Sequence, residues 1–201
     1  IADVFVRTRD VLTDSPKVEV DVHVRNQSGR AVQRLLSALL SAPDSSDQER
    51  QQATVTIEPG DSTVTLAFGA LPAKPLWTLD QPALHIMSVL MQDAPGSQGA
   101  LDMYATRFGF REAVFKDDGF YLNGEHVKLI GLDRHQTYPY IGAAAPARLQ
   151  RKDADILKYE LGCNIVRTSH YPQSPHFLER CDEIGLLVFE EIPGWQFIGD
   201  S

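Results

Sequence analysis

The sequence predicts a mostly β domain followed by an α/β domain: an immunoglobulin-like β-sandwich over residues 1–113, then the first three β/α units of a TIM barrel over residues 114–201. Two observations predict this order. The first part holds roughly seven short strand-like segments with turn residues between them, which is typical of such a sandwich. From about Phe115 onward, short apolar segments alternate with helix-like segments, as in the repeating units of a parallel barrel.

The strands of the sandwich are predicted from their alternation of apolar and polar residues. In residues 17–26 every second residue from Val18 to Val24 is a valine, which gives one buried face and one wet face. His23 lies on the wet face and is interpreted as solvated. The segment Glu58-Pro59-Gly60-Asp61 is a turn that joins two strands. The other predicted strands are residues 4–8, 54–57, 63–66, 84–91 and 103–110.

Three segments of the first domain lack a clear strand pattern. Residues 31–42 by themselves favour an amphipathic helix, because two leucine pairs recur at helical spacing. Residues 43–52 are polar and charged without periodicity, which predicts an exposed loop. Residues 71–82 contain three prolines and are typical of an extended crossing. Trp77 within them is interpreted as a core residue rather than as a platform for a sugar.

Three predicted strands of the second domain end in polar or charged side chains. The strands are residues 127–131, 164–166 and 186–189, and helix-like segments at about residues 148–160 and 175–184 lie between them. Active sites of α/β barrels lie at the carboxyl ends of the strands, so these polar side chains are candidate site residues. They are Asp133, Arg134 and His135 after the first strand, Arg167 and His170 after the second, and Glu190 and Glu191 after the third.

Four stretches of the second domain resemble one known family. They are Tyr121-Leu122-Asn123-Gly124, Gly131-Leu132-Asp133-Arg134-His135, Arg167-Thr168-Ser169-His170-Tyr171-Pro172 and Cys181-Asp182-Glu183-Ile184-Gly185-Leu186. They look like the opening of the catalytic barrel in glycoside hydrolase family 2, the family of β-galactosidases, β-glucuronidases and β-mannosidases. The resemblance covers most of the chain from about Lys74 onward, and earlier residues fit the β-sandwich that precedes this barrel. By this resemblance, residues 31–42 form a strand instead of a helix.

The resemblance implies a retaining glycoside hydrolase that cleaves terminal β-glycosidic bonds. β-Galactosidase is the favoured activity, because it is the commonest among relatives. In that family the nucleophile and the acid/base glutamate follow the fourth and seventh barrel strands, so both are expected beyond Ser201. A complete barrel takes about 250 residues, whereas about 85 residues follow Lys116 in this chain, which begins at Ile1. We therefore expect a fragment of a larger enzyme, with an incomplete barrel and no catalytic glutamate of its own.

The resemblance also assigns roles to the strand-end residues. Arg167 is expected to support the nucleophile, while His135 and His170 are expected to hydrogen-bond sugar hydroxyls. Asp133 stands where the family commonly has asparagine, and it is a further candidate for substrate binding. Arg134 fits two alternatives equally well, a substrate contact or a structural ion pair below the barrel mouth. Trp195 follows a strand end and is a candidate for stacking on a sugar face, with a packed lid as the alternative.

Glu190 and Glu191 are not expected to be the catalytic pair. Adjacent residues of a strand point to opposite faces, so their carboxylates do not converge on one glycosidic bond. One of them is expected to orient barrel residues while the other packs outward. The best-known β-galactosidases continue here into a Glu-x-His magnesium motif, but this chain reads Glu191-Ile192-Pro193-Gly194-Trp195-Gln196. We therefore predict neither a metal nor another cofactor.

Composition limits the partners. The formal net charge of −8 disfavours nucleic acid and anionic membranes but is indifferent to a neutral sugar. No apolar run approaches the ~18 residues of a membrane span. Cys163 and Cys181 lack zinc-like spacing and are predicted to be buried thiols. A carbohydrate substrate is the expected partner, and the open sheet edge of an incomplete barrel also predicts self-association into a homo-oligomer.

An alternative function stays open at this point. The sandwich could serve as a non-catalytic carbohydrate-binding or structural module. A purely structural role would be favoured if Arg167 and His170 were buried with their polar atoms satisfied, away from any cleft, whereas a carbohydrate-binding sandwich would not explain the chemistry of the strand-end residues. The sequence shows no signal peptide and indicates no compartment.

Overall fold

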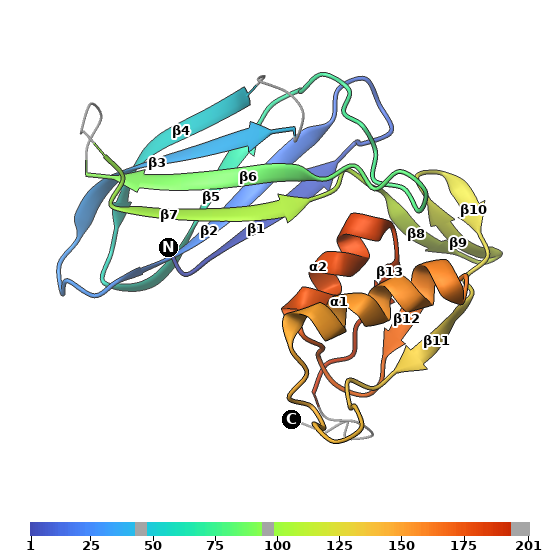
Figure 1. The fold of residues 1–201 in the computed structure, drawn as a ribbon. Coiled ribbons are helices and arrows are strands. Elements are labelled where there is room, and N and C mark those ends of the chain that lie inside the picture. The colour runs from blue at the N-terminus through green and yellow to red at the C-terminus, as the bar shows by residue number, and fades with distance from the viewer. Residues whose placement is uncertain (43–47, 94–98, 194–201) are drawn as a thin grey trace. The chain divides into compact units, whose positions relative to one another are not determined.

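The computed structural model describes residues 1–42, 48–93 and 99–193, which divide into two compact units (Figure 1). The first unit comprises Ile1–Leu76 and Leu84–Glu112, and the second comprises Trp77–Ala83 and the chain from Ala113 onward. Among these residues no helix has the length and apolar character that crossing a membrane requires.

The first unit is a sandwich of two antiparallel sheets within the described residues. One sheet has the strand order β1-β2-β5 and the other has the order β4-β3-β6-β7. The fold class predicted from the sequence is confirmed. The strand bounds are β1 Asp3–Arg9, β2 Lys17–Asn26, β3 Val32–Ser41, β4 Gln48–Ile57, β5 Gly60–Phe68, β6 His85–Gln92 and β7 Asp102–Phe108.

The core of the sandwich lies between the inner faces of the two sheets. The four valines of β2 from Val18 to Val24 are at most 2% exposed, as their alternation predicts. Leu36 and Leu40 of β3 and Met87 of β6 pack into the same core and are 0% exposed. Residues 31–42 therefore contain a strand, as the family resemblance implies, and the helical composition is overridden. The reason is that β3 pairs with β4 on one side and with β6 on the other.

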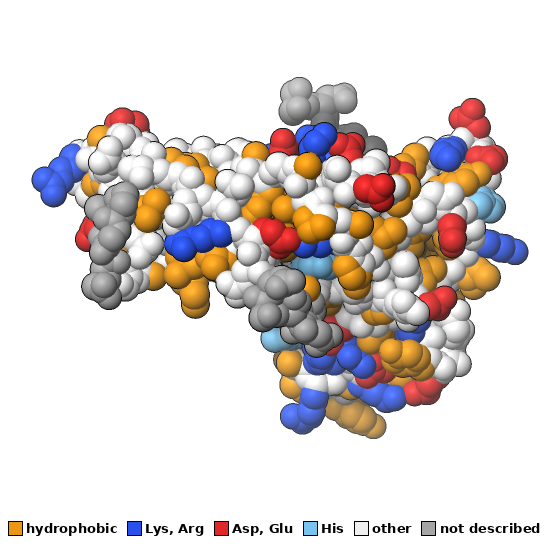
Figure 2. Space-filling model, turned by 90° about the horizontal axis from the view of Figure 1, so that it is seen from above, with side chains coloured by type: hydrophobic (Ala, Val, Ile, Leu, Met, Phe, Trp, Pro, Cys, Tyr) orange, Lys and Arg blue, Asp and Glu red, His pale blue; other side chains and the backbone are white. Residues whose placement is uncertain are grey.

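The outer face of the sheet β1-β2-β5 carries charged pairs. Arg7 donates hydrogen bonds to Asp21 and Glu19, and Arg25 pairs with Asp61 at 2.6 Å. His23 lies on this face, but its Nδ1 is 2.9 Å from the Thr63 hydroxyl, so it is half-buried and bonded rather than simply solvated. Charged side chains of both signs are also mixed on the face of the molecule that Figure 2 shows.

The prediction of an exposed loop at residues 43–52 is wrong in its second half. Residues 43–47 lie outside the described residues, while residues 48–52 form the first half of β4 and pair with β3. β4 is the edge strand of its sheet and exposes every second side chain. An edge strand of this kind is compatible with polar, charged residues, which explains why composition misled the prediction. The turn at Pro59-Gly60 then carries the chain into the other sheet.

His85, the first residue of β6, is buried without a hydrogen-bond partner. Its side chain is 1% exposed, and neither ring nitrogen has a partner among the described residues. The ring packs against Phe108 and Phe110 at centroid distances of 6.0 and 4.9 Å. Burial lowers the pKa of His85 below its ordinary value of 6.5, and the Lys74 ammonium lowers it further, against an opposing effect of Glu49. The imidazole is therefore buried in its neutral form.

We expect acid to destabilise the sandwich through His85. Because the pKa is lower in the folded than in the unfolded chain, the unfolded state binds the proton first, and the free energy of unfolding decreases as the pH falls below about 6.5. His85→Leu should remove this decrease. The decrease in the free energy of unfolding at still lower pH, which is caused by carboxylates such as Asp21, should remain. Urea denaturation of both chains at about pH 7 and about pH 5 measures the effect. An equal decrease in the wild type and the variant would contradict it.

The second unit contains two small sheets and the helices. The antiparallel sheet has the order β10-β9-β8, and the parallel sheet has the order β11-β12-β13. In chain order, helices separate the successive parallel strands, as the β/α alternation predicts, and they pack on the sheet (Figure 1). The bounds are β8 Ala113–Lys116, β9 Gly119–Leu122, β10 Glu125–Val127, β11 Gly131–Arg134, α1 Ala147–Asp155, the π-helix η1 Ile156–Glu160, β12 Ile165–Thr168, α2 Pro175–Ile184 and β13 Leu187–Phe189.

The first parallel strand is not at residues 127–131, where the sequence predicts it. Val127 ends β10, which pairs antiparallel with β9, and the parallel strand is β11, which begins at Gly131. A Cβ on Gly131 would lie 1.9 Å from the Ile165 carbonyl oxygen, so only glycine permits this close approach. The strand β12 likewise extends to Thr168. As a result, Asp133, Arg134 and Arg167 lie within strands rather than after them.

The helices cover one face of the parallel sheet. Phe177, Cys181 and Ile184 of α2 pack with Val166 of β12 in a core of buried side chains. Cys163 and Cys181 are both buried free thiols, as predicted, and burial raises the pKa of the Cys181 thiol well above its ordinary range.

The segment Trp77–Ala83 packs on the second unit, although it lies between two strands of the sandwich in sequence. Trp77 is 1% exposed, which confirms its interpretation as a core residue, and its Nε1 donates to the Asp182 carbonyl at 2.7 Å. The Lys158 ammonium donates to the Leu79 and Gly185 carbonyls at 2.8 and 2.9 Å. These contacts tie the segment to the end of α2.

The two outer strands of the parallel sheet have no further strand partner among the described residues. Nearby apolar side chains are more than half exposed: Ile130 55%, Leu132 51%, Phe189 56% and Ile192 84%. We therefore expect the 201-residue chain to self-associate through this edge. Static light scattering measures this, and a monomer at all concentrations would contradict it. Leu132→Lys, which places a charge on β11, should weaken the association.

Candidate functional site

The candidate site lies on the face of the parallel sheet opposite to the helices. Asp133, Arg167 and Phe189 are neighbours in register across β11, β12 and β13, and all three side chains are exposed. Val166 and Thr168, which alternate with Arg167 along β12, are 0% exposed. In a closed barrel the side chains of this exposed row point into the interior. Arg167 Nη1 lies 3.8 Å from Asp133 Oδ2, so opposite charges are neighbours in this row.

Glu191 connects Arg167 with His170. Its Oε1 accepts a hydrogen bond from Arg167 Nε at 2.5 Å, and its Oε2 lies 3.2 Å from His170 Nδ1. The Glu191 side chain is 14% exposed, whereas Arg167 is 45% and His170 is 28% exposed. A carboxylate that is shared by a guanidinium and an imidazole makes charge-assisted hydrogen bonds, which are shorter and stronger than neutral ones.

His135 and His170 lie close together, although they follow different strands. Their ring centroids are 5.4 Å apart in an edge-to-face arrangement, and the Tyr171 ring is 6.2 Å from His135. The His135 side chain is exposed. Imidazole nitrogens can both donate to and accept from hydroxyl groups. The carboxyl end of this sheet therefore presents a guanidinium, two imidazoles and two carboxylates on one side, an arrangement that suits a polar ligand with several hydroxyls.

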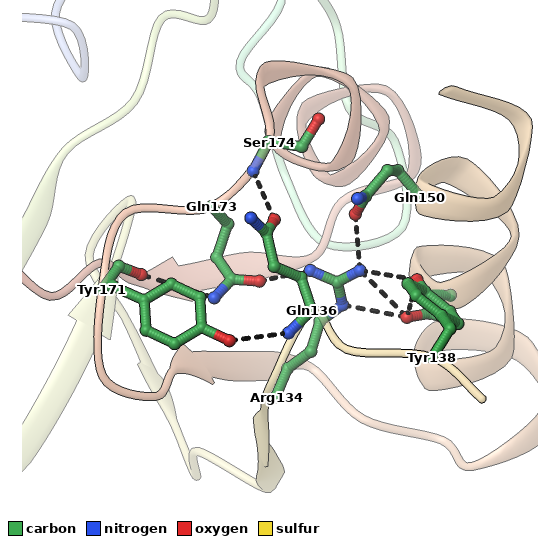
Figure 3. A network of polar contacts seen from close by, with 8 residues as sticks. Arg134, Gln136, Tyr138, Gln150, Tyr171, Gln173 and Ser174 are labelled. Atoms are coloured by element: carbon green, nitrogen blue, oxygen red, sulfur yellow. Dashed lines mark hydrogen bonds and ion pairs between the residues drawn. The ribbon is translucent and has the colours of Figure 1, made fainter. Parts of the chain in front are cut away.

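A buried network around Arg134 supports this surface from below (Figure 3). Arg134 is 5% exposed, and both Nε and Nη2 bond to Asp153 Oδ2, at 3.0 and 2.9 Å. Nη2 also donates to the Gln150 and Tyr138 oxygens at 2.6 and 2.9 Å, and Nη1 donates to Gln173 Oε1. The guanidinium carbon lies 3.9 Å from the centre of the Phe177 ring. Of the two alternatives for Arg134, these contacts favour the structural ion pair.

The network also joins the segments that follow β11 and β12. The Gln136 backbone N–H donates to the Tyr171 hydroxyl at 3.2 Å, and the Gln136 side chain accepts from the Ser174 N–H at 2.9 Å (Figure 3). The Tyr138 hydroxyl donates to Asp153 at 2.5 Å; its burial, together with this bond, raises the pKa of Tyr138 to about 12. His135 precedes Gln136 directly and His170 precedes Tyr171. The network thus fixes the backbone on which both histidines stand.

Glu190 and Trp195 are the remaining candidates from the sequence. Glu190 accepts a hydrogen bond from the Gln173 backbone N–H at 2.9 Å and is exposed, and both glutamates follow β13, which ends at Phe189, rather than lying within a strand. Trp195 lies outside the described residues. Within residues 1–42, 48–93 and 99–193, no three His, Cys, Asp or Glu side chains are arranged to hold a metal ion.

Two family models match the chain. The model described as glycosyl hydrolases family 2 matches residues 1–111, and the model described as glycosyl hydrolases family 2, TIM barrel domain, matches residues 113–198. The chain belongs to glycoside hydrolase family 2. The resemblance seen in the strand-end motifs is thereby confirmed.

Three similar proteins are much longer than the chain. A β-galactosidase of Thermoanaerobacterium thermosulfurigenes is 44% identical over 201 residues, which are 100% of this chain and 28% of the relative. A β-galactosidase of Thermoanaerobacter pseudethanolicus is 62% identical over 126 residues, which are 62% of this chain and 17% of the relative. A solved structure of Bacteroides uniformis β-glucuronidase 2, covalently bound to cyclophellitol-6-carboxylate aziridine, superposes with a TM-score of 0.85 at 29% identity. That match covers 94% of this chain and 23% of the glucuronidase, so the chain spans less than a third of the length of each of these proteins.

Several residues of the site were not found from the sequence. Asp153, Gln150 and Gln173 hold Arg134, and none of these three follows a predicted strand end. Thr168 holds Glu191 and ends β12, two residues beyond the predicted end of that strand. One usable signal was the spacing of Gln150 and Asp153, which puts two polar side chains on one face of α1.

Proposed function

We propose that this chain is part of a retaining glycoside hydrolase that cleaves terminal β-glycosidic bonds, with β-galactosides as its substrates. The observation that carries the proposal is the cluster of Arg167, His170, His135 and Glu191 at the carboxyl end of a parallel sheet. The choice of galactose rests on the β-galactosidase that is 44% identical over all 201 residues.

In this proposal the chain provides part of the active site and other strands of the barrel provide the catalytic carboxylates. Retaining glycosidases use two carboxyl groups about 5 to 5.5 Å apart, one as nucleophile and one as acid and then base. By family resemblance both follow strands later than β13, beyond Ser201. The Arg167 guanidinium would stabilise the ionised nucleophile and fix its rotamer. His135 and His170 would bind sugar hydroxyls, and a contact that tightens in the oxocarbenium-like state lowers the barrier.

Steady-state kinetics of the enzyme that contains this chain test the proposal. The substrates are the 4-nitrophenyl derivatives of β-galactose, β-glucuronic acid and α-galactose, and NMR follows the anomeric configuration of the first product. We expect the β-galactoside to be hydrolysed fastest, with retention. Inversion would refute the retaining mechanism, and preference for the glucuronide would refute the sugar. Sugar binding without hydrolysis of any of the three would favour the non-catalytic alternative.

We expect His170→Ala to lower kcat/KM on the β-galactoside about tenfold or more, because it removes a contact that strengthens in the transition state. His23→Ala is the matched control, since His23 lies on the outer face of the sandwich with one hydrogen bond to Thr63. It should change the free energy of unfolding by no more than about 0.5 kcal/mol and leave the kinetics intact. Unchanged kinetics in His170→Ala would remove His170 from the site.

A further inference from the structure

The two oxygens of the Glu191 carboxylate serve different partners. Oε1 binds the Nε end of the Arg167 guanidinium at 2.5 Å, and Oε2 lies 3.2 Å from Nδ1 of His170. With 14% of its side chain exposed, this carboxylate is more buried than either partner. Water can therefore replace the hydrogen bonds of this carboxylate only in part. If either oxygen were no longer a charged acceptor, the bond between Glu191 and one of the two partners would be lost.

The backbone of Glu191 is held as firmly as its side chain. Its N–H donates to the Thr168 hydroxyl at 2.8 Å, and Thr168, the last residue of β12, is 0% exposed. The chain leaving β13 is thereby attached to the neighbouring strand one residue beyond Arg167. This attachment directs the Glu191 side chain toward β12, where Arg167 and His170 stand.

The contact with His170 has a chemical consequence. A carboxylate can only accept hydrogen bonds, so Nδ1 of His170 must carry the proton that is shared with Glu191. The protonated nitrogen of an imidazole is set by the hydrogen bond that it makes, and the other nitrogen then takes the complementary role. In the neutral ring, Nε2 is therefore an acceptor, which suits a sugar hydroxyl as donor. On the other side, Glu191 holds the Nε end of Arg167 while Nη1 lies 3.8 Å from Asp133.

We propose that Glu191 is a positioning residue, which fixes the tautomer of His170 and the rotamer of Arg167 for the reaction. This inference rests on the proposed function for its catalytic consequence, but the tautomer itself does not depend on activity. Neither conservative replacement reproduces the bridge. Glutamine has a single acceptor oxygen, and aspartate is too short by one methylene to reach both partners.

The first test reads the tautomer in the 201-residue chain. The side-chain nitrogens of ¹⁵N-labelled histidine report protonation by NMR, and the loss of one pair of signals in His170→Ala identifies His170 among the six histidines. We expect Nδ1 to be protonated in the wild type and the Nδ1–H share to fall in Glu191→Gln. Glu190→Gln is the matched control, because its amide oxygen can still accept from the Gln173 N–H. An unchanged His170 tautomer in Glu191→Gln, or an equal change in Glu190→Gln, would overturn the inference.

The second test is kinetic and uses the enzyme that contains this chain. Glu191→Gln should lower kcat about ten- to a hundredfold, with a smaller change in KM, while Glu179→Gln, at a 52% exposed glutamate of α2, keeps wild-type values. Glu191→Asp keeps the charge and should also lose activity; it carries the test if Glu191→Gln fails to fold. Wild-type kcat in Glu191→Asp would overturn the bridging role. If the wild-type enzyme hydrolyses no β-glycoside, the proposed function fails, yet the tautomer measurement still decides whether Glu191 positions His170.

Discussion

Arg167→Ala should lower kcat about a hundredfold or more in the enzyme that contains this chain, while the free energy of unfolding changes little. The expected size of this decrease follows from the role of the guanidinium beside the negative charge of the nucleophile. Removing a fixed group that stabilises such a charge typically costs about 100- to 1000-fold in kcat. Stability should be spared because the Arg167 side chain is 45% exposed and faces away from the helix-packed core. Steady-state kinetics on 4-nitrophenyl β-galactoside, with urea denaturation alongside, measure both quantities.

The control for Arg167→Ala is another arginine that pairs with an aspartate. Arg25→Ala removes a 60% exposed side chain that bonds Asp61 on the sandwich surface. Exposed pairs contribute at most about 1 kcal/mol, so this variant should keep both activity and stability. Wild-type kcat in Arg167→Ala, or a loss of activity that only follows a loss of folded protein, would contradict the assigned role.

Arg134→Met should be among the most destabilising single substitutions in the second unit. It removes the positive partner of Asp153 and a donor to Gln150, Gln173 and Tyr138 at once. Breaking a buried pair by removing one partner costs about 3 to 5 kcal/mol, because a buried charge is left uncompensated. Trp77 is buried in the same unit and reports its unfolding by fluorescence. A Trp195→Phe background makes Trp77 the sole tryptophan of the chain, which has two.

Arg151→Met is the matched control for Arg134→Met. Arg151 lies on α1, the helix that also carries Asp153, and pairs with Glu183, but its side chain is 36% exposed. The expected loss is at most about 1 kcal/mol. A loss of this small size in Arg134→Met would contradict a structural role and return Arg134 to the candidates for substrate binding. If Arg134→Met lowers the free energy of unfolding strongly, we also expect a lower affinity for substrate, because the network holds the segments that carry His135 and His170.

The sequence predicts the fold class well because both domains follow strong local patterns. The alternating valines of β2 and the strand and helix order after β11 need no tertiary information. β3 shows the limit, since its leucine pairs favour a helix and only pairing with β4 and β6 makes it a strand. β4 shows the complementary limit, because an edge strand can be built from polar residues.

The sequence could predict which residues belong to the candidate site, but not the hydrogen bonds and ion pairs between them. Strand ends identify Asp133, His135, Arg167 and His170 as candidates, and the structure brings these four together. The carboxylate that bridges them depends on how the strands pair. The predicted bounds of the first parallel strand were too early in the sequence, because the apolar run before Gly131 has a more typical strand pattern than β11. No sequence pattern shows that Arg134 points into the helix layer while Asp133 points out. That division follows from the alternation along β11 once its true bounds are known.

In the proposed function, this chain binds the sugar of the substrate at the carboxyl ends of β11, β12 and β13. The most direct test is a crystal structure of the enzyme that contains it, trapped with a 2-deoxy-2-fluoro-galactoside. We expect a sugar at these strand ends, with ring nitrogens of His135 and His170 within about 3.2 Å of its hydroxyls. It also predicts the Arg167 guanidinium in contact with the carboxylate that carries the sugar. A sugar bound on the sandwich instead, or more than about 4 Å from the side chains of His135, His170 and Arg167, would refute this location of the sugar site.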